Sequence, residues 1–88
     1  MRLIYTSQFK KDFKKIQSQG KNISYLETII GTLLTKQSLD PKYRDHKLVG
    51  KWKNHRDCHI EPDWLLIYRI IDDTLFIERT GTHSELFK

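Results

Sequence analysis

Residues 64–80 read WLLIYRIIDDTLFIERT, and this stretch decides the fold. Residues 64–71 form an almost unbroken apolar run of a strand's length, which predicts a buried strand at the centre of a sheet. Residues 74–80 predict a second strand, and Asp72-Asp73 is a link short enough for a hairpin, although it is not the favoured Asn-Gly pair. The stretch therefore predicts two neighbouring antiparallel strands.

Shorter strands are predicted upstream of this hairpin. After Pro41 the pattern changes from helical to extended, with candidate strands at residues 46–49 and 56–60. Pro62 suits the turn into the central strand, because proline is excluded from the interior of a sheet. A weak alternation at residues 2–6 predicts a short first strand.

The first half of the chain predicts two amphipathic helices. In the first helix, Phe9, Phe13 and Ile16 recur at helical spacing, with Ser7 as the expected N-cap and Gly20 as the C-terminal stop. The opposite face of this helix carries four basic side chains, those of Lys10, Lys11, Lys14 and Lys15.

The second helix is expected to start at a capping box formed by residues 24–27, and to end before Pro41 at Leu39-Asp40. One side of it is apolar, with Ile23, Leu26, Ile30, Leu33 and Leu34. The predicted fold class is therefore α+β. It is a single domain over residues 1–88, in which an N-terminal strand and a helical hairpin pack on one face of an antiparallel sheet.

Composition limits the class of protein. The chain has 88 residues, of which 38% are hydrophobic and 31% are charged, as expected of a soluble globular domain. No apolar run approaches the roughly 18 residues of a membrane helix, and the N-terminus lacks the pattern of a signal peptide. Cys58 is the single cysteine and cannot form an internal disulfide. We therefore expect a cytoplasmic protein without membrane contact.

The net charge of +5 is distributed unevenly. Residues 1–53 hold 12 basic and 4 acidic side chains (+8), whereas residues 54–88 hold 4 basic and 7 acidic (−3). A basic half indicates a polyanionic partner, either nucleic acid or an acidic protein segment, or else a lysine surface kept for solubility. The long reach of the lysines on the first helix suits the phosphates of a nucleic acid or an acidic protein segment, and the plain alternative is a solvated face.

The predicted hairpins bring functional side chains toward one end of the sheet. With Ile71 opposite Thr74, counting back along the strands places Trp64 near Gly81. The residues expected to converge there are His59, Asp63, Trp64, Arg79 and His83, and His46 can join them from the junction between a loop and a strand.

This set of side chains suits RNA cleavage without a metal or another cofactor. A ribose 2′-hydroxyl must lose its proton and attack the adjacent phosphate, and the leaving 5′-oxygen must gain a proton. Histidine suits these transfers because its unperturbed pKa lies near neutrality. Arginine matches two phosphate oxygens with its planar fork, a carboxylate can orient a histidine or act as the base, and aromatic rings can stack on bases.

Each residue also has a structural interpretation. A single histidine is usually a polar surface residue, which is the interpretation preferred for His55 in an exposed link. Asp63 can simply form the turn after Pro62, and Trp64 and Phe87 can be core residues.

Two further alternatives concern ion pairs and metals. Arg79 can belong to a structural salt bridge with Asp63 or with a neighbour of Glu78. His55 and His59 are four residues apart, which would suit zinc on a helix, but the stretch is predicted to be a strand. No metal site is therefore predicted.

The second half of the chain carries a recognisable set of motifs. They are DHKLVGKWK at residues 45–53, RDCHI at 56–60, EPDWLLIY at 61–68 and RTGTHSELF at 79–87. These motifs and their spacings closely resemble the YafQ-type branch of the RelE/ParE toxin superfamily, the mRNA interferases of bacterial type II toxin–antitoxin pairs. The first half of the chain agrees in length and helical layout.

The resemblance implies a compact α+β toxin that cleaves mRNA, often during translation in the A site of the 70S ribosome. It also implies a small antitoxin, encoded beside the toxin, that blocks the active site and helps repress the operon, so that DNA is contacted only through the antitoxin complex. By motif, the active-site positions of the family fall on His46, His59, Asp63, Trp64, Arg79, His83 and Phe87.

We assign roles within this set. His83 is expected to be the general acid, and His59 or Asp63 to take the 2′ proton, with support from His46. Arg79 is expected to hold the scissile phosphate. The aromatic residues Trp64 and Phe87 are expected to shape the pocket or stack on a base.

Two other functions are open at this point. The ParE side of the same superfamily has the same fold but inhibits DNA gyrase without nuclease activity. An RNA-binding module without turnover is the other. Three histidines and an arginine at matching motif positions argue against the ParE function. Cleavage of RNA by the purified protein in EDTA would distinguish the nuclease from the binding module.

Overall fold

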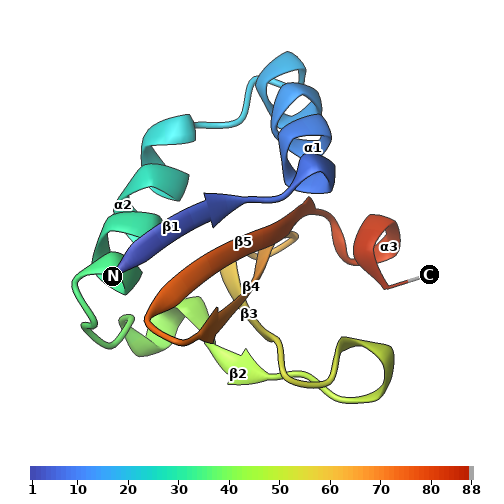
Figure 1. The fold of residues 1–88 in the computed structure, drawn as a ribbon. Coiled ribbons are helices and arrows are strands. Elements are labelled where there is room, and N and C mark those ends of the chain that lie inside the picture. Colours follow the sequence, from blue (N-terminus) through green and yellow to red (C-terminus); the bar gives the residue numbers. More distant parts are fainter. Residues whose placement is uncertain (88) are drawn as a thin grey trace.

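The computed structural model describes residues 1–87, which form a five-stranded sheet flanked by helices (Figure 1). The order of the strands across the sheet is β1-β5-β4-β3-β2. No helix of these residues is long and apolar enough to cross a membrane. Along the chain the elements are β1 (Arg2–Tyr5), α1 (Ser7–Ser18), α2 (Ile23–Leu34), η1 (Pro41–Tyr43), β2 (His46–Lys47), η2 (Gly50–Trp52), β3 (Arg56–Glu61), β4 (Trp64–Ile71), β5 (Thr74–Gly81) and α3 (His83–Leu86).

The α+β fold is confirmed, with one difference in the sheet. Strands β2 to β5 are antiparallel to their neighbours, as predicted. Strand β1, however, lies parallel to β5, with Leu3 opposite Leu75 and Ile4 opposite Phe76, so the sheet is mixed. Parallel neighbours need a long crossover connection, and here the rest of the chain between β1 and β5 provides it.

Both helices begin at other residues than expected and α2 ends earlier, whereas Gly20, with φ 75°, follows the end of α1 as predicted. Thr6, not Ser7, caps α1 and accepts a hydrogen bond from the Phe9 N–H at 3.0 Å. Asn22, not the serine two residues later, caps α2, because its side chain reaches the Ser24 N–H at 3.1 Å. Helix α2 already ends at Leu34.

The two faces of the sheet bury different sets of residues. Helices α1 and α2 lie on one side of the sheet (Figure 1), whereas the segment after β2, with Leu48 and Trp52, packs against the other side. The larger core, on the helical side, includes Phe9, Ile16, Leu26, Ile29, Cys58, Trp64, Leu66, Tyr68, Leu75 and Ile77. A smaller cluster on the other side contains Leu65, Ile67 and Leu86, with Leu48 and Trp52 packed against them.

The β4–β5 hairpin has the predicted turn but a shifted register beyond it. Ile71 lies opposite Thr74, and both residues of the Asp72-Asp73 link have positive φ angles, of 49° and 59°, as a type I′ turn requires. A bulge follows between Ile67 and Tyr68, so that Leu65, and not Trp64, lies opposite Gly81. The register is therefore shifted by one residue from the predicted count, because a bulge inserts a residue into one strand.

Candidate active site

Three histidines from separate elements meet beside the smaller cluster. His46 begins β2, His59 lies on β3 and His83 is the first residue of α3. The centroids of the His46 and His59 rings are 6.3 Å apart, and those of His59 and His83 are 5.2 Å apart. The structure thus brings together the three histidines that the sequence predicts at the site.

A glycine allows α3 to fold back and present His83. Thr82 and Glu85 form a capping box, in which the Thr82 N–H donates to Glu85 Oε1 at 2.9 Å and the Glu85 N–H donates to Thr82 Oγ1 at 3.2 Å. A Cβ at Gly81 would lie 2.9 Å from Glu85 Oε1. Glycine at this position therefore lets the capping box close, which fixes the start of the helix and with it the His83 side chain.

Asp63 orients His83 through two contacts. Its Oδ1 atom accepts a hydrogen bond from the His83 backbone N–H at 2.9 Å and lies 2.7 Å from His83 Nδ1. The first of these bonds, followed by the second, holds the pKa of the Asp63 carboxyl below its ordinary value. A charged Asp63 requires a proton on Nδ1, which leaves Nε2 of His83 as the nitrogen that faces a substrate.

Asp57 is a second carboxylate at the site, and the sequence analysis missed it. Its side chain is 3% exposed and its Oδ1 atom lies 3.1 Å from His46 Nδ1. Nδ1 lies still closer, at 2.7 Å, to the Arg44 carbonyl oxygen, so this nitrogen carries a proton between two acceptors. Burial raises the pKa of Asp57, against the opposing charges of His46, His59 and His83. Strand alternation could have identified Asp57, because Asp57 and His59 are two residues apart on a predicted strand and so share a face.

His59 occupies the most enclosed position of the three histidines. Burial lowers its pKa, and the charges of His83, Arg44 and His46 act in the same direction, while Asp57 opposes them. A lowered pKa keeps the imidazole neutral near neutral pH, which is the form that accepts a proton.

A hollow of ≈ 520 Å³ opens beside His59. It is bordered by two basic residues, Lys42 and Arg44, and by Tyr25 and Tyr43. The Lys42 ammonium lies over the Tyr43 ring, 5.1 Å from its centroid. Sequence reasoning did not place this segment at the site, because it precedes the motif-rich half of the chain.

Two predicted site residues are turned away from the histidines. Trp64 is 1% exposed in the larger core, and its indole N–H donates to Thr80 Oγ1 at 2.9 Å, which favours packing over stacking on a base. Arg79 forms a two-bonded ion pair with the buried Asp12, through Nε at 3.0 Å and Nη2 at 3.1 Å. The structural alternative for Arg79, an ion pair, is therefore present, but with a different partner from those expected.

The positions of Phe87 and His55 can also be compared with the sequence predictions. Phe87 remains 38% exposed with its ring 6.5 Å from that of His83, so it borders the site. His55, expected on the surface, has a side chain only 14% exposed. It packs against Trp52, with ring centroids 5.1 Å apart, and its Nε2 atom lies 3.4 Å from Glu78.

The four lysines of α1 are exposed, as predicted, but they do not form one uniform surface. Lys15 forms an ion pair with Glu85, on the helix that carries His83. Lys10 and Lys14 instead border a groove between α1 and α2. Lys15 is therefore linked to the element that presents His83, whereas Lys10 and Lys14 belong to a different surface.

Within residues 1–87, no three histidine, cysteine, aspartate or glutamate side chains are arranged to hold a metal ion. The close contacts at the site are instead pairwise, each joining one carboxylate to one imidazole. Such an arrangement is suited to proton transfer and to binding of a phosphate.

Comparison with known proteins identifies the family of the chain. Residues 1–88 match the family described as the bacterial toxin of type II toxin–antitoxin system, YafQ. The mRNA interferase toxin YafQ of Escherichia coli K12 is 44% identical over 84 residues, which cover 94% of this chain and 91% of that protein.

Solved structures give the same result. A copper-bound mutant toxin from Helicobacter pylori superposes with a TM-score of 0.95 at 47% identity, covering 99% of both chains. A chain of the Escherichia coli DinJ–YafQ complex superposes with a TM-score of 0.92 at 42% identity, covering 100% of both chains. The chain therefore belongs to the YafQ family of bacterial toxins from type II toxin–antitoxin systems.

Proposed function

We propose that this protein is an mRNA interferase, an endoribonuclease that cleaves mRNA through attack of the ribose 2′-hydroxyl. The observation that carries the proposal is the meeting of three histidines, two of them in contact with carboxylates, at one end of the sheet. The name of the Escherichia coli relative, mRNA interferase toxin YafQ, supports it.

His83 acts as the general acid that protonates the leaving 5′-oxygen. Its Nδ1 atom lies 2.7 Å from Asp63, which fixes the orientation of the imidazole and directs Nε2 toward a substrate. The side chain is 51% exposed, so a substrate can reach Nε2.

His59 acts as the general base, with His46 in support. The lowered pKa of His59 favours the neutral form that can take the 2′ proton. Asp63 is less suited to this role than the sequence analysis allowed, because its Oδ1 atom already contacts both the backbone N–H and the ring of His83. Its low pKa also makes it a weak base.

The scissile phosphate is held by cations near His59. Lys42 and Arg44 border the hollow beside this histidine and present positive charge to it. Arg79, the residue assigned to the phosphate from the motifs, is paired with Asp12 and does not line this hollow, so Lys42 and Arg44 are better placed for that role.

The partners follow from the same role. We propose a cognate antitoxin, since the Escherichia coli relative is found in a complex named DinJ–YafQ. We also propose mRNA as substrate, bound in the A site of the 70S ribosome, which places the protein in the cytoplasm. DNA would be reached only through the antitoxin complex. The comparisons do not support the ParE-type gyrase inhibitor, because the family and the relatives matched are YafQ toxins.

Cleavage of RNA by the purified protein in EDTA, with and without ribosomes, tests this function. Products should end in a 2′,3′-cyclic phosphate or a 3′-phosphate, because the ribose is the nucleophile. The Helicobacter pylori relative was crystallised with copper, so added copper and zinc are necessary comparison arms. Cleavage that requires added metal, or products that end only in 3′-hydroxyl groups, would show that the mechanism is wrong.

The lysines of α1 provide a separate test of ribosome binding. Replacing Lys10, Lys11, Lys14 and Lys15 by glutamine should reduce the slope of log affinity against log salt by roughly 0.7 for each lost phosphate contact. Turnover of a short oligonucleotide at saturating concentration should change little. An unchanged slope and unchanged ribosome affinity would mean that this face is only solvated.

A further inference from the structure

The hollow beside His59 is larger than a single phosphate group requires. Its volume of ≈ 520 Å³ lies within the roughly 300–1,000 Å³ that is usual for sites of small organic ligands. Beyond His59 and the cations Lys42 and Arg44, its walls are formed by Tyr25, Tyr43, Ile60, Glu61 and Pro62. The hollow therefore offers space and side chains to a second chemical group next to the scissile phosphate.

Two tyrosines give the hollow aromatic surfaces. Tyr25, on α2, is 49% exposed, so much of its ring is open. Tyr43, on η1, is half-buried against the larger core and carries the Lys42 ammonium over its ring. Aromatic side chains commonly stack on the unpaired bases of single-stranded RNA, and stacking accepts every base. Tyr25 is the better placed of the two for a base, because its ring is the more exposed.

Glu61 adds a hydrogen-bond acceptor to the same hollow. It is exposed and forms no salt bridge within residues 1–87. Adenine, cytosine and guanine each present an exocyclic amino group that donates to a carboxylate. Uracil presents a single N–H between two carbonyl oxygens, which a carboxylate repels. Stacking gives binding without choice of base, whereas Glu61 distinguishes uracil from the other three bases.

The position of the hollow decides which nucleotide it takes. His59 lines it, whereas His83 does not. In the proposed mechanism, His59 takes the proton from the 2′-hydroxyl of the upstream nucleotide, and His83 protonates the 5′-oxygen of the downstream nucleotide. The hollow therefore lies on the upstream side of the cleaved bond.

We propose that this hollow binds the base of the nucleotide immediately upstream of the cleaved bond, stacked on Tyr25, and that Glu61 selects adenine, cytosine or guanine against uracil. The inference rests on the proposed function and adds the position and base preference of one nucleotide. Glu61 acts here as a specificity-determining residue and takes no part in proton transfer.

Binding of nucleoside 3′-monophosphates tests the preference without ribosomes or cleavage. These compounds carry the base and phosphate of the upstream product, and NMR signals of the Tyr25 and His59 rings report their binding. The adenine, cytosine and guanine compounds should bind about tenfold more tightly than the uracil compound. Nucleoside 5′-monophosphates should bind more weakly and without this preference, because their base lies on the other side of the phosphate. Equal affinities of the four 3′-monophosphates would overturn the proposal.

Variants of Glu61 and Tyr25 separate selection from stacking. Glu61→Gln keeps the size of the side chain and can also donate to the uracil carbonyls, so it should bring the four affinities to within about threefold of one another. Tyr25→Ala should weaken all four by about tenfold, whereas Tyr25→Phe, which keeps the ring, should bind like the wild type. An unchanged base preference in folded Glu61→Gln would remove Glu61 from recognition.

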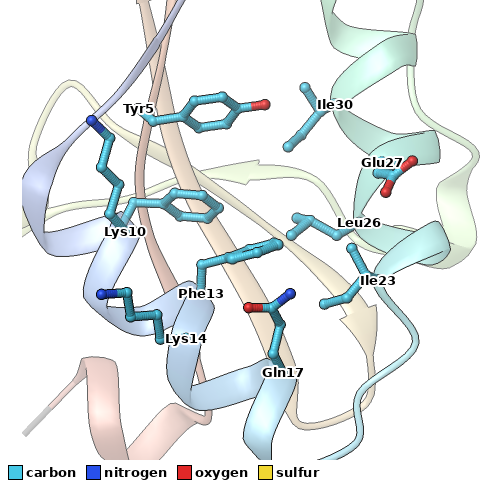
Figure 2. Close-up of a pocket in the computed structure, with 10 residues that line it drawn as sticks. Tyr5, Lys10, Phe13, Lys14, Gln17, Ile23, Leu26, Glu27 and Ile30 are labelled. Carbon is cyan, nitrogen blue, oxygen red and sulfur yellow. The ribbon is translucent and has the colours of Figure 1, made fainter.

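A second groove, between α1 and α2, supplies matched controls. Figure 2 shows Tyr5 and Glu27 among the side chains that line it. Tyr5 is 41% exposed and Glu27 is exposed, and neither lines the hollow beside His59. Tyr5→Ala and Glu27→Gln should therefore leave the four affinities unchanged. Equal effects of the two glutamine variants would mean that net charge, and not Glu61, sets the preference.

Cleavage assays separate a failure of this inference from a failure of the proposed function. An oligonucleotide in which only one position keeps its 2′-hydroxyl can be cleaved only after that position, whether it is free or in the A site of a ribosome. The value of kcat/KM should be about tenfold lower after uridine than after the other three nucleosides, and Glu61→Gln should remove this difference. Equal cleavage by the wild type after all four would refute this inference and leave the proposed function intact. Failure to cleave any of them, with or without ribosomes, would contradict the proposed function itself and this inference with it.

Discussion

The site contains two histidine–carboxylate pairs that look alike and differ in their electrostatics. Asp63 Oδ1 lies 2.7 Å from His83 Nδ1, and Asp57 Oδ1 lies 3.1 Å from His46 Nδ1. Yet the Asp63 side chain is 65% exposed, whereas that of Asp57 is 3% exposed. The pKa of Asp63 is lowered by hydrogen bonds from His83, while the pKa of Asp57 is raised by burial.

This difference shows that the surroundings of a carboxylate, and not its nearest partner, decide what it can do. Asp63 remains solvated and accepts two bonds from one residue, so it serves as a fixed anion that orients His83. Asp57 is buried away from water, and its Oδ1 atom accepts no well-aligned hydrogen bond from His46. The reason is that His46 Nδ1 donates to the Arg44 carbonyl oxygen instead. The charge of Asp57 therefore acts at a distance, on His46 and His59 together.

The largest expected effect comes from removing the histidine of the exposed pair. His83→Ala should reduce RNA cleavage by about 10²–10⁴, the usual loss for a general acid. Because half of the side chain is exposed, the fold and the antitoxin complex should survive, which thermal unfolding and co-purification can confirm. His46→Ala should cost less, since His46 only supports the base. Near-normal cleavage by a folded His83→Ala protein would remove His83 from the mechanism.

Changing the exposed carboxylate should have a smaller effect. Asp63→Asn keeps an acceptor for His83 but loses the charge, and charged hydrogen bonds are stronger than neutral ones, so the cleavage rate should fall by about tenfold. The acidic limb of the pH profile of kcat/KM should stay in place, since Asp63 is not among the charges that shift the pKa of His59. A shift of that limb would mean that Asp63 itself is the base.

Replacing the buried carboxylate, Asp57, should change the pH dependence of kcat/KM. Asp57 raises the pKa of His59, so Asp57→Asn should lower that pKa further and move the acidic limb of kcat/KM to lower pH. NMR titration of the His59 ring measures the same shift directly. Asp45→Asn is the control, because Asp45 bonds Arg56 and Tyr68 and is not among the charges that act on His59. An unmoved His59 titration would show that Asp57 has only a structural role.

The smallest expected effect is on the stability of the fold. Ionisation of Asp57 should lower the free energy of unfolding, whereas ionisation of Asp63 should raise it. The pKa of Asp57 in the folded protein is above the ordinary 3.8, so the wild type loses free energy of unfolding as pH rises through that folded value. The pKa of Asp63 is below 3.8, so its stabilisation is present above 3.8 and is lost as pH falls through the folded value.

Urea unfolding of the two asparagine variants can measure this difference. Relative to the wild type, Asp57→Asn should gain stability between acid and neutral pH. Asp63→Asn should be less stable than the wild type at neutral pH and approach it in acid. The same sign for both variants would contradict the different environments of the two pairs.

The sequence by itself determined the elements and their order. The apolar run at residues 64–71 and the following Asp-Asp link produced the central hairpin as expected, because burial pattern and turn chemistry are local properties. The motifs around His46, His59 and His83 were enough to identify the family, and these three side chains do meet.

The tertiary structure decided which way the remaining side chains point. Trp64, Leu66 and Tyr68 face the helices, whereas Leu65 and Ile67 face the other side, so strand alternation separates Trp64 from the histidines although it is adjacent to Asp63 in the chain. A bulge in β5 then displaces the register by one residue and sets Arg79 opposite Ile67. The bond from Arg79 to Asp12 joins residues 67 positions apart, and no local pattern records such a contact.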